Sequence, residues 1–284
     1  MKILVTGVSG QLGFDVVREG NKYGFEMYGT GSKELDITNK ENVCEYINKV
    51  KPDVIVHCAA YTAVDKAEDY KEDCYDVNTN GTKYLAEAAK QIDAKFIYIS
   101  TDYVFDGLGD APFNEADIPN PIGQYGITKF EGEMVVRSIL EKYFIVRISW
   151  VFGLNGNNFI KTMLRLSETR DELNIVGDQF GSPTYTVDLS HLLLQMAQTE
   201  KYGIYHASNE GFCSWAEFSQ EIFNQANKTV KVHSITTEEY PTRAIRPKNS
   251  RLSKQKLVDA GFNQLPTWEN ALSRYLVELE KEVK

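Results

Sequence analysis

The sequence lacks the features of several protein classes. Its four cysteines form no CxxC pair, and its four histidines show neither HExxH nor paired-ligand spacing, so no zinc site is predicted. No apolar run reaches the roughly 18 residues that cross a bilayer, and the apolar run 3–5 is too short for a signal peptide. We therefore expect a cytoplasmic protein with buried free thiols and structural histidines.

A surplus of positive charge is also absent. The chain carries 31 Lys and Arg against 40 Asp and Glu, a net charge of −9. Such a surface repels nucleic acid and the anionic face of a membrane, so we expect neither as a partner. The content of 42% hydrophobic and 25% charged residues argues against disorder, and 284 residues allow one large domain or two modest ones.

What the first half does have is an alternation of short apolar segments and amphipathic stretches. Strands are predicted at 2–6, 25–29, 53–58, 96–100 and 144–148. Helices are predicted to begin at residue 14 and to cover 40–49, 77–91 and 125–140. This alternation predicts an α/β fold with a Rossmann-type doubly wound parallel sheet.

The pattern loosens after residue 150. Helices are predicted at 159–168, 188–197 and 215–225, and strand-like pieces at 203–206 and 230–234 either return to the main sheet or stay in a second lobe. We expect residues 1–150 to form the main domain, with some later segments returning to it. Residues 151–284 would mainly form a smaller C-terminal lobe that binds the substrate.

Three glycines separate the first predicted strand from the first helix. Gly7, Gly10 and Gly13 give the spacing GxxGxxG, which by itself can mark any tight turn. Here the turn opens a βα series, where glycines let the backbone approach a pyrophosphate that the helix N-terminus attracts. Residues 1–150 are therefore predicted to bind NAD(P).

The sequence leaves the choice between NADH and NADPH open. The segment 28–33, where an acidic residue would bind the ribose 2′-OH of NADH, has no carboxylate before Glu34 and Asp36. Ser32 and Lys33 can accept a 2′-phosphate, but Lys33 can equally be a solvated loop charge.

Thr101, Tyr125 and Lys129 fit the catalysis of carbonyl reduction. Hydride delivery to a ketone also requires a proton, and a tyrosine can supply it when a nearby ammonium group lowers its pKa. Tyr125 and Lys129 are spaced i, i+4 on one helix face, and Thr101 lies at a strand end where it can bond to the carbonyl. The alternative is a strand-end threonine and a helical Tyr/Lys pair without a catalytic role.

Several of these segments together resemble a known family. The segments 6–13, 59–65, 100–107 and 125–129 are similar to the extended short-chain dehydrogenases/reductases, and within these to the dTDP-4-dehydrorhamnose reductase family. The similarity continues through four segments of the second half: 149–152, 157–159, 178–184 and 246–252.

The resemblance implies NAD(P)H-dependent reduction of the 4-keto group of dTDP-4-dehydro-β-L-rhamnose, in dTDP-rhamnose biosynthesis for surface polysaccharide. Tyr125 would donate the proton, Thr101 would orient the carbonyl, and Lys129 would lower the tyrosine pKa and hold the ribose. The expected cofactor-binding residues are Gly7, Gly10, Gln11, Leu12, Gly13, Asp36, Ile37, Ala59, Ala60, Tyr61, Thr62, Tyr125 and Lys129.

The resemblance further implies that Thr101, Asp102 and Trp150 touch the sugar nucleotide, although a tryptophan after a buried strand is core nearly as often. Four cations within nine residues suit the diphosphate of the sugar nucleotide, and we expect Arg246 and Arg251 to be its ligands. The alternative is a solvated loop whose cations pair with surface acids. The four are Arg243, Arg246, Lys248 and Arg251.

Two further expectations concern assembly and rival functions. Some relatives bind magnesium through glutamates at a dimer interface, but the first such position here is Asp15, a shorter carboxylate, so a metal-bridged homodimer is in doubt. A 4,6-dehydratase would need Thr-Asp-Glu where this chain has Tyr103 after Thr101 and Asp102. Another sugar-nucleotide reductase or epimerase and a non-catalytic NAD(P)-binding regulatory subunit stay open as alternatives.

Overall fold

The apolar segments of the first half form one parallel sheet in the computed structural model, which describes residues 1–282. The sheet has the strand order β10-β5-β4-β3-β1-β2. All its pairings are parallel. Its strands are β1 (Lys2–Thr6), β2 (Glu26–Thr30), β3 (Val54–His57), β4 (Lys95–Thr101), β5 (Tyr143–Ile148) and β10 (Gly203–His206).

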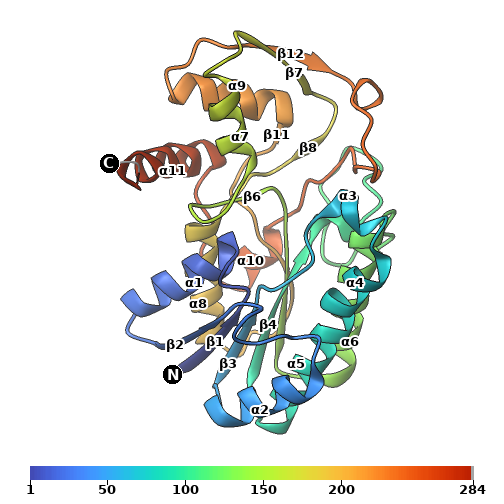
Figure 1. Cartoon of the computed structure of the whole chain (residues 1–284), viewed down its shortest axis with the longest axis vertical. Coiled ribbons are helices and arrows are strands. Elements are labelled where there is room, and N and C mark those ends of the chain that lie inside the picture. The colour runs from blue at the N-terminus through green and yellow to red at the C-terminus, as the bar shows by residue number, and fades with distance from the viewer. Residues whose placement is uncertain (283–284) are drawn as a thin grey trace.

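Helices cover both faces of this sheet, which explains why its central strands are continuously apolar (Figure 1). Side chains alternate between the faces, so Ile3 and Val5 of β1 pack in one core and Leu4 in the other. One face carries α1 (Gln11–Lys22) and α8 (Thr186–Ala197); the other carries α2 (Lys40–Val50), α5 (Thr82–Gln91) and α6 (Gln124–Ile139). The predicted α/β class is confirmed.

The segment predicted as one helix over 77–91 is divided. A π-helical turn at Asp76–Gly81 precedes α5, and the short helices α3 (Val64–Ala67) and α4 (Lys71–Tyr75) come before it. Regular helix periodicity cannot reveal the extra residue that a π turn accommodates. The turn matters because it lies against the helix that carries the predicted Tyr/Lys pair.

The later strands are divided between the main sheet and the second lobe. β10 joins the edge of the main sheet, whereas β12 (Lys231–Ile235) pairs with β7 (Glu172–Val176) in the second lobe. That lobe has an aromatic core of its own, with Phe152, Phe218 and Tyr275 among its buried members.

The remaining elements belong mostly to this second lobe, at the top of Figure 1. They are β6 (Val151–Phe152), α7 (Phe159–Leu166), β8 (Phe180–Gly181), β9 (Thr184–Tyr185), β11 (Cys213–Ser214), α9 (Trp215–Gln225), α10 (Gln255–Asp259) and α11 (Trp268–Glu282).

Cys74 and Cys213 are buried free thiols as expected, whereas Cys44 and Cys58 are only half-buried. Within residues 1–282, no helix has both the length and the apolar character that spanning a bilayer requires.

Candidate active site

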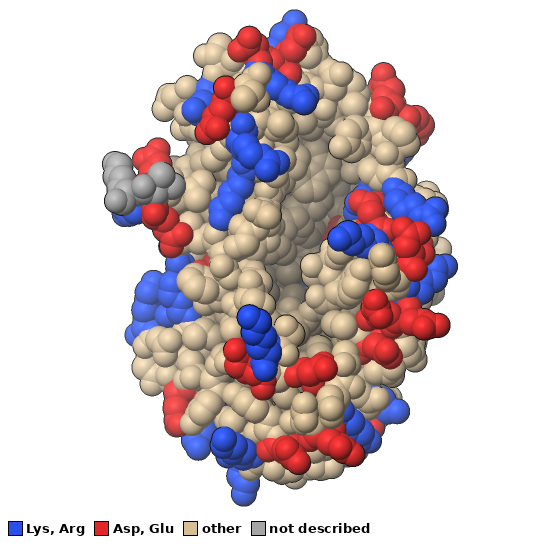
Figure 2. All heavy atoms as spheres, viewed as in Figure 1, with Lys and Arg blue, Asp and Glu red and all other residues tan. Residues whose placement is uncertain are grey.

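A cavity of about 1960 Å³ lies between the carboxyl ends of the main strands and the second lobe. Figure 2 shows it as a hollow whose charged groups lie mostly at the rim. The cavity brings together nearly all the predicted site residues: Gly7, Gly10, Gln11, Leu12, Gly13, Asp36, Ile37, Ala59, Ala60, Tyr61, Thr62, Thr101, Asp102, Tyr125, Lys129, Trp150 and Arg246. Arg251 is not part of its lining.

The glycine turn is built for close approach. Gly7 adopts the left-handed φ of 74°, and a Cβ there would lie 2.6 Å from the Ala59 nitrogen. A Cβ on Gly13 would lie 2.5 Å from the Gly7 carbonyl oxygen. The first amides of α1 therefore face the cavity over a backbone surface without side chains, an arrangement that fits a dinucleotide pyrophosphate.

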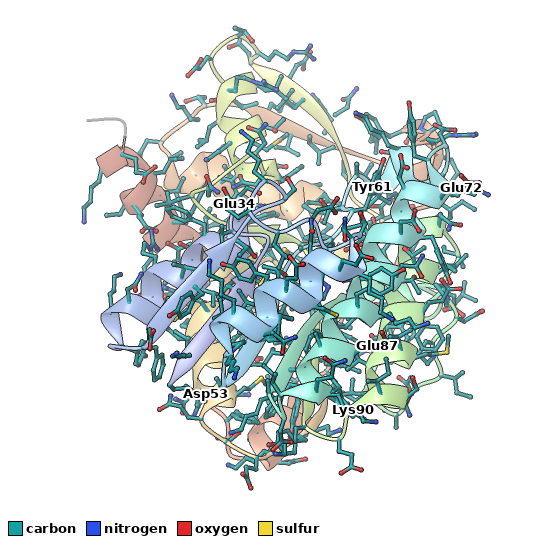
Figure 3. All side chains as sticks on the ribbon, turned by 60° about the horizontal axis from the view of Figure 1, so that its bottom comes forward. Glu34, Asp53, Tyr61, Glu72, Glu87 and Lys90 are labelled. Atoms are coloured by element: carbon teal, nitrogen blue, oxygen red, sulfur yellow. The ribbon has the colours of Figure 1, made fainter. Side chains whose placement is uncertain are left out.

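Loops that follow β2 and β3 form the next part of the wall. Glu34 and Tyr61 lie in these loops, beyond the carboxyl ends of the two strands (Figure 3). A Glu34 carboxylate oxygen accepts from the Gly31 N–H at 2.9 Å, and Asp36 accepts from the Thr38 N–H at 3.0 Å. Ser32 lines the cavity but Lys33 does not, so these contacts leave NADH and NADPH as alternatives.

His57 supports the base of this wall. The buried ring lies 2.8 Å from the Thr6 hydroxyl and 3.1 Å from the Thr82 hydroxyl. The same Thr6 oxygen accepts from the Ala59 N–H. Burial lowers the pKa of His57 to about 3, so the ring stays neutral and acts as a structural link.

Thr101, Tyr125 and Lys129 converge on the cavity from β4 and α6. Burial, and next the Asp102 charge, raise the pKa of Tyr125, which keeps the hydroxyl protonated and able to donate. The sequence predicted a lowered tyrosine pKa, and this direction is wrong here because burial dominates. The Lys129 ammonium lies 4.1 Å from the centroid of the Tyr98 ring.

Asn78 is a site-supporting residue that sequence reasoning missed. It lies in the π-helical turn, and its side-chain oxygen accepts from the Tyr61 N–H at 2.8 Å. Its amide nitrogen donates to the Thr128 hydroxyl at 3.0 Å, next to Lys129. A polar residue on the buried side of a helical pattern was the only signal, and many such residues have no link to a site.

Trp150 lines the cavity next to the core of the second lobe. Its φ of 47° is left-handed, which is unusual for a bulky residue, and its ring stacks on Trp215 with centroids 3.5 Å apart. Gly181 leaves room for the indole because it has no side chain: a Cβ there would lie 2.7 Å from the Trp150 ring.

Asp102 lies beside Thr101. Burial raises the pKa of Asp102 to about 6, although hydrogen bonds with Ser250 and Thr101 act to lower it.

Of the four clustered cations, Arg246 alone faces the cavity. It donates to the Tyr103 hydroxyl at 3.0 Å and to Asp65 at 2.5 Å. Arg251 instead lies over the Phe180 ring, 4.4 Å from its centroid, and donates to the Asp110 carbonyl. Arg243 and Lys248 form ion pairs with surface carboxylates: Asp69, Asp178 and Glu238.

Asp15 does not fit a magnesium site shared between chains. Its side chain is fully buried, where it accepts from Thr186 and pairs with Arg18 at 2.9 Å. Over residues 1–282, no group of three or more His, Cys, Asp and Glu side chains is arranged to hold a metal ion.

The parallel sheet, the glycine turn and the Thr/Tyr/Lys set together define a nicotinamide-dependent oxidoreductase of the short-chain dehydrogenase/reductase type. Residues 1–281 match the family model described as RmlD substrate binding domain. The chain is 43% identical over 286 residues to a dTDP-4-dehydrorhamnose reductase of Aggregatibacter actinomycetemcomitans, covering 95% of this chain and 97% of that relative. The chain belongs to this reductase family.

Solved structures agree with this assignment. A dTDP-4-dehydrorhamnose reductase of Clostridium acetobutylicum superposes with a TM-score of 0.96 at 44% identity, covering 99% of this chain and all of that one. A second, from Bacillus anthracis in complex with NADP, gives 0.95 at 44% identity, covering 98% and 99% of the two chains.

Proposed function

We propose that the protein uses NADPH or NADH to reduce the 4-keto group of dTDP-4-dehydro-β-L-rhamnose, which yields dTDP-β-L-rhamnose. The observation that carries this proposal is the single cavity in which the glycine turn, the Thr101/Tyr125/Lys129 set and Arg246 meet. A chain of this reductase family with such a cavity has both a place for a dinucleotide and the groups that carbonyl reduction needs.

When bound, NADPH or NADH would supply the hydride for C4 of the sugar. Tyr125 would give its hydroxyl proton to the carbonyl oxygen as hydride addition turns that oxygen into a strongly basic alkoxide. Burial raises the pKa of Tyr125, so the hydroxyl carries its proton beforehand. Thr101 donates a hydrogen bond that orients the carbonyl. The Lys129 ammonium would hold the ribose of the bound cofactor and would stabilise the phenolate that proton transfer leaves behind.

Substrate selection belongs to the side of the cavity next to the second lobe. Arg246 offers guanidinium donors to the diphosphate, and Trp150 offers an aromatic face to the sugar. Asp102, beside Thr101, completes the set of groups that would touch the sugar nucleotide.

Two rival functions fit the chain less well. A 4,6-dehydratase needs an acid/base pair after the threonine, and Tyr103 stands where its glutamate would be. A regulatory subunit has no need of a Thr/Tyr/Lys set and an arginine that line the same cavity.

The direct test is turnover with the combined product of the dehydratase and 3,5-epimerase steps. Wild-type protein should oxidise NADPH or NADH, and Tyr125→Phe should lower kcat by about 10² to 10⁴-fold with nearly unchanged cofactor affinity, since it loses only the proton donor. Wild-type protein that binds the cofactor but never oxidises it with this substrate would favour the regulatory subunit.

The proposal extends to location and assembly. Four free thiols suit a reducing compartment such as the cytoplasm. Exposed apolar side chains at Tyr75, Ile127 and Met134 offer surface for a homodimer without metal. Cell fractionation and sedimentation with and without EDTA test these two points.

A further inference from the structure

Lys129 is charged in the proposed reaction yet is almost completely buried. Its side chain enters the cavity from α6, and only 2% of the residue is exposed. Burial lowers the pKa of its ammonium to about 7, against the opposing charge of Glu133. Neighbouring groups must therefore keep the Lys129 ammonium protonated and fix its orientation.

Tyr98 contacts Lys129 at two points. The Lys129 Nζ lies 4.1 Å from the centroid of the Tyr98 ring, well inside the range of a cation–π interaction. The Tyr98 hydroxyl donates to the Lys129 carbonyl oxygen at 3.2 Å. One side chain of β4 thus holds both the charged end of Lys129 and the helical turn that carries it.

The sequence makes room for this contact. Tyr98 is fully buried, and Gly132 lies where a Cβ would collide with the Tyr98 hydroxyl oxygen. A side chain at residue 132 would push α6 away from β4, so the glycine allows the ring to lie beneath the lysine.

Few other groups act on the ammonium charge. Glu133 on α6 favours it but is bound to Arg147 and to the Ser100 hydroxyl. Two thiols complete the acidic groups that face it: Cys58 beyond β3 and Cys74 on α4. The neighbouring His57 on β3 is neutral, since burial lowers its pKa to about 3. The Tyr98 ring face, 4.1 Å from the ammonium, therefore adds to the attraction that Glu133 exerts on the charge.

We propose that Tyr98 is a positioning residue for Lys129, whose ring face keeps the ammonium protonated and whose hydroxyl fixes the helical turn. Its kinetic consequence rests on the proposed reductase function, but its effect on lysine protonation does not. The two ideas can therefore fail separately.

The experiment titrates Lys129 directly, by the NMR shift of ¹³Cε in labelled lysine, with the signal identified by its loss in Lys129→Arg. Tyr98→Phe keeps the ring and should leave the Lys129 pKa within about 0.3 unit. Tyr98→Leu removes the ring and should lower it by about one unit, the size expected for a desolvated cation–π contact.

A second variant guards against misfolding. Tyr98→pentafluorophenylalanine keeps the ring shape but reverses its quadrupole, so it should also lower the Lys129 pKa while Tyr98→Phe does not. Equal lysine titration in wild type and in both ring-altering variants overturns the proposal.

The pH profile of kcat/KM gives the matching kinetic readout. Because the ammonium is lost as pH rises through its pKa, a lower pKa moves the alkaline limb of the profile to lower pH in Tyr98→Leu. Tyr98→Phe should lose roughly two- to tenfold in rate, with its limb in place. A shifted lysine titration without any wild-type turnover would refute the reductase function alone.

Discussion

At the scale of single residues, the glycine turn can be tested with one methyl group. Gly7→Ala places a Cβ against the Ala59 backbone and forces a left-handed φ on alanine. We expect a loss of about 1–3 kcal/mol in the free energy of unfolding and a cofactor Kd at least roughly tenfold higher, because the loop beyond β3 must move away from the pyrophosphate position.

Gly24→Ala is the matched control for this prediction. Gly24 has the same φ of 74°, but nothing lies within 4 Å of a Cβ there. It should show the backbone strain without the change in cofactor Kd. Equal cofactor affinities in the two variants would contradict a role of Gly7 in the binding site.

Single residues also show what sequence can and cannot reveal. The positions of Gly7, Thr101 and Tyr125 at the cavity were predictable because each follows from the local order of strand, turn and helix along the chain. The Trp150–Trp215 stack was not, since it joins residues far apart in the chain whose only sequence signal is aromatic character. Arg251 was predicted from charge alone, and charge does not show that its guanidinium lies on the Phe180 ring.

At the scale of elements, a buried ion pair fixes α6 against the sheet. Glu133 on α6 accepts from Arg147 of β5 at 2.7 Å and from the Ser100 hydroxyl of β4 at 2.6 Å. Glu133→Gln removes the negative charge and leaves the buried arginine uncompensated. We expect the free energy of unfolding to fall by about 3–5 kcal/mol in urea titrations.

Glu131→Gln, on the same helix but half-buried, should change stability by less than about 1 kcal/mol. The double variant Glu133→Leu with Arg147→Met should recover much of the loss, because neither charge is then left buried alone. A single variant as stable as wild type would mean that this pair does not hold α6 in place.

Elements were predicted most closely where one periodicity runs from end to end. The strand at 2–6 and the helix at 215–225 match β1 and α9 at both ends. The π-helical turn escaped prediction because it depends on packing with α6. The partner of β12 could not be chosen because a short strand of mixed polarity does not indicate which sheet it joins.

At the scale of the whole molecule, the chain is acidic, but groups inside its cavity attract anionic ligands. The net charge is −9, yet the cavity presents helix α1 amides on one side and Arg246 on the other. Arg246 also links the second lobe to the main domain: it lies in the loop that follows β12, and its guanidinium donates to Asp65 on α3. The diphosphate of the substrate would therefore bind where the two lobes meet.

Replacing this arginine should separate substrate affinity from cofactor affinity. Arg246→Ala removes charge-assisted hydrogen bonds to the diphosphate, so we expect the Kd for dTDP to rise by about 10 to 100-fold, measured by calorimetry, with an unchanged Kd for NADPH. Arg251→Ala, outside the cavity lining, is the control and should alter neither. If Arg246→Ala weakens both ligands equally, the loop supports the cavity as a whole and the diphosphate site lies elsewhere.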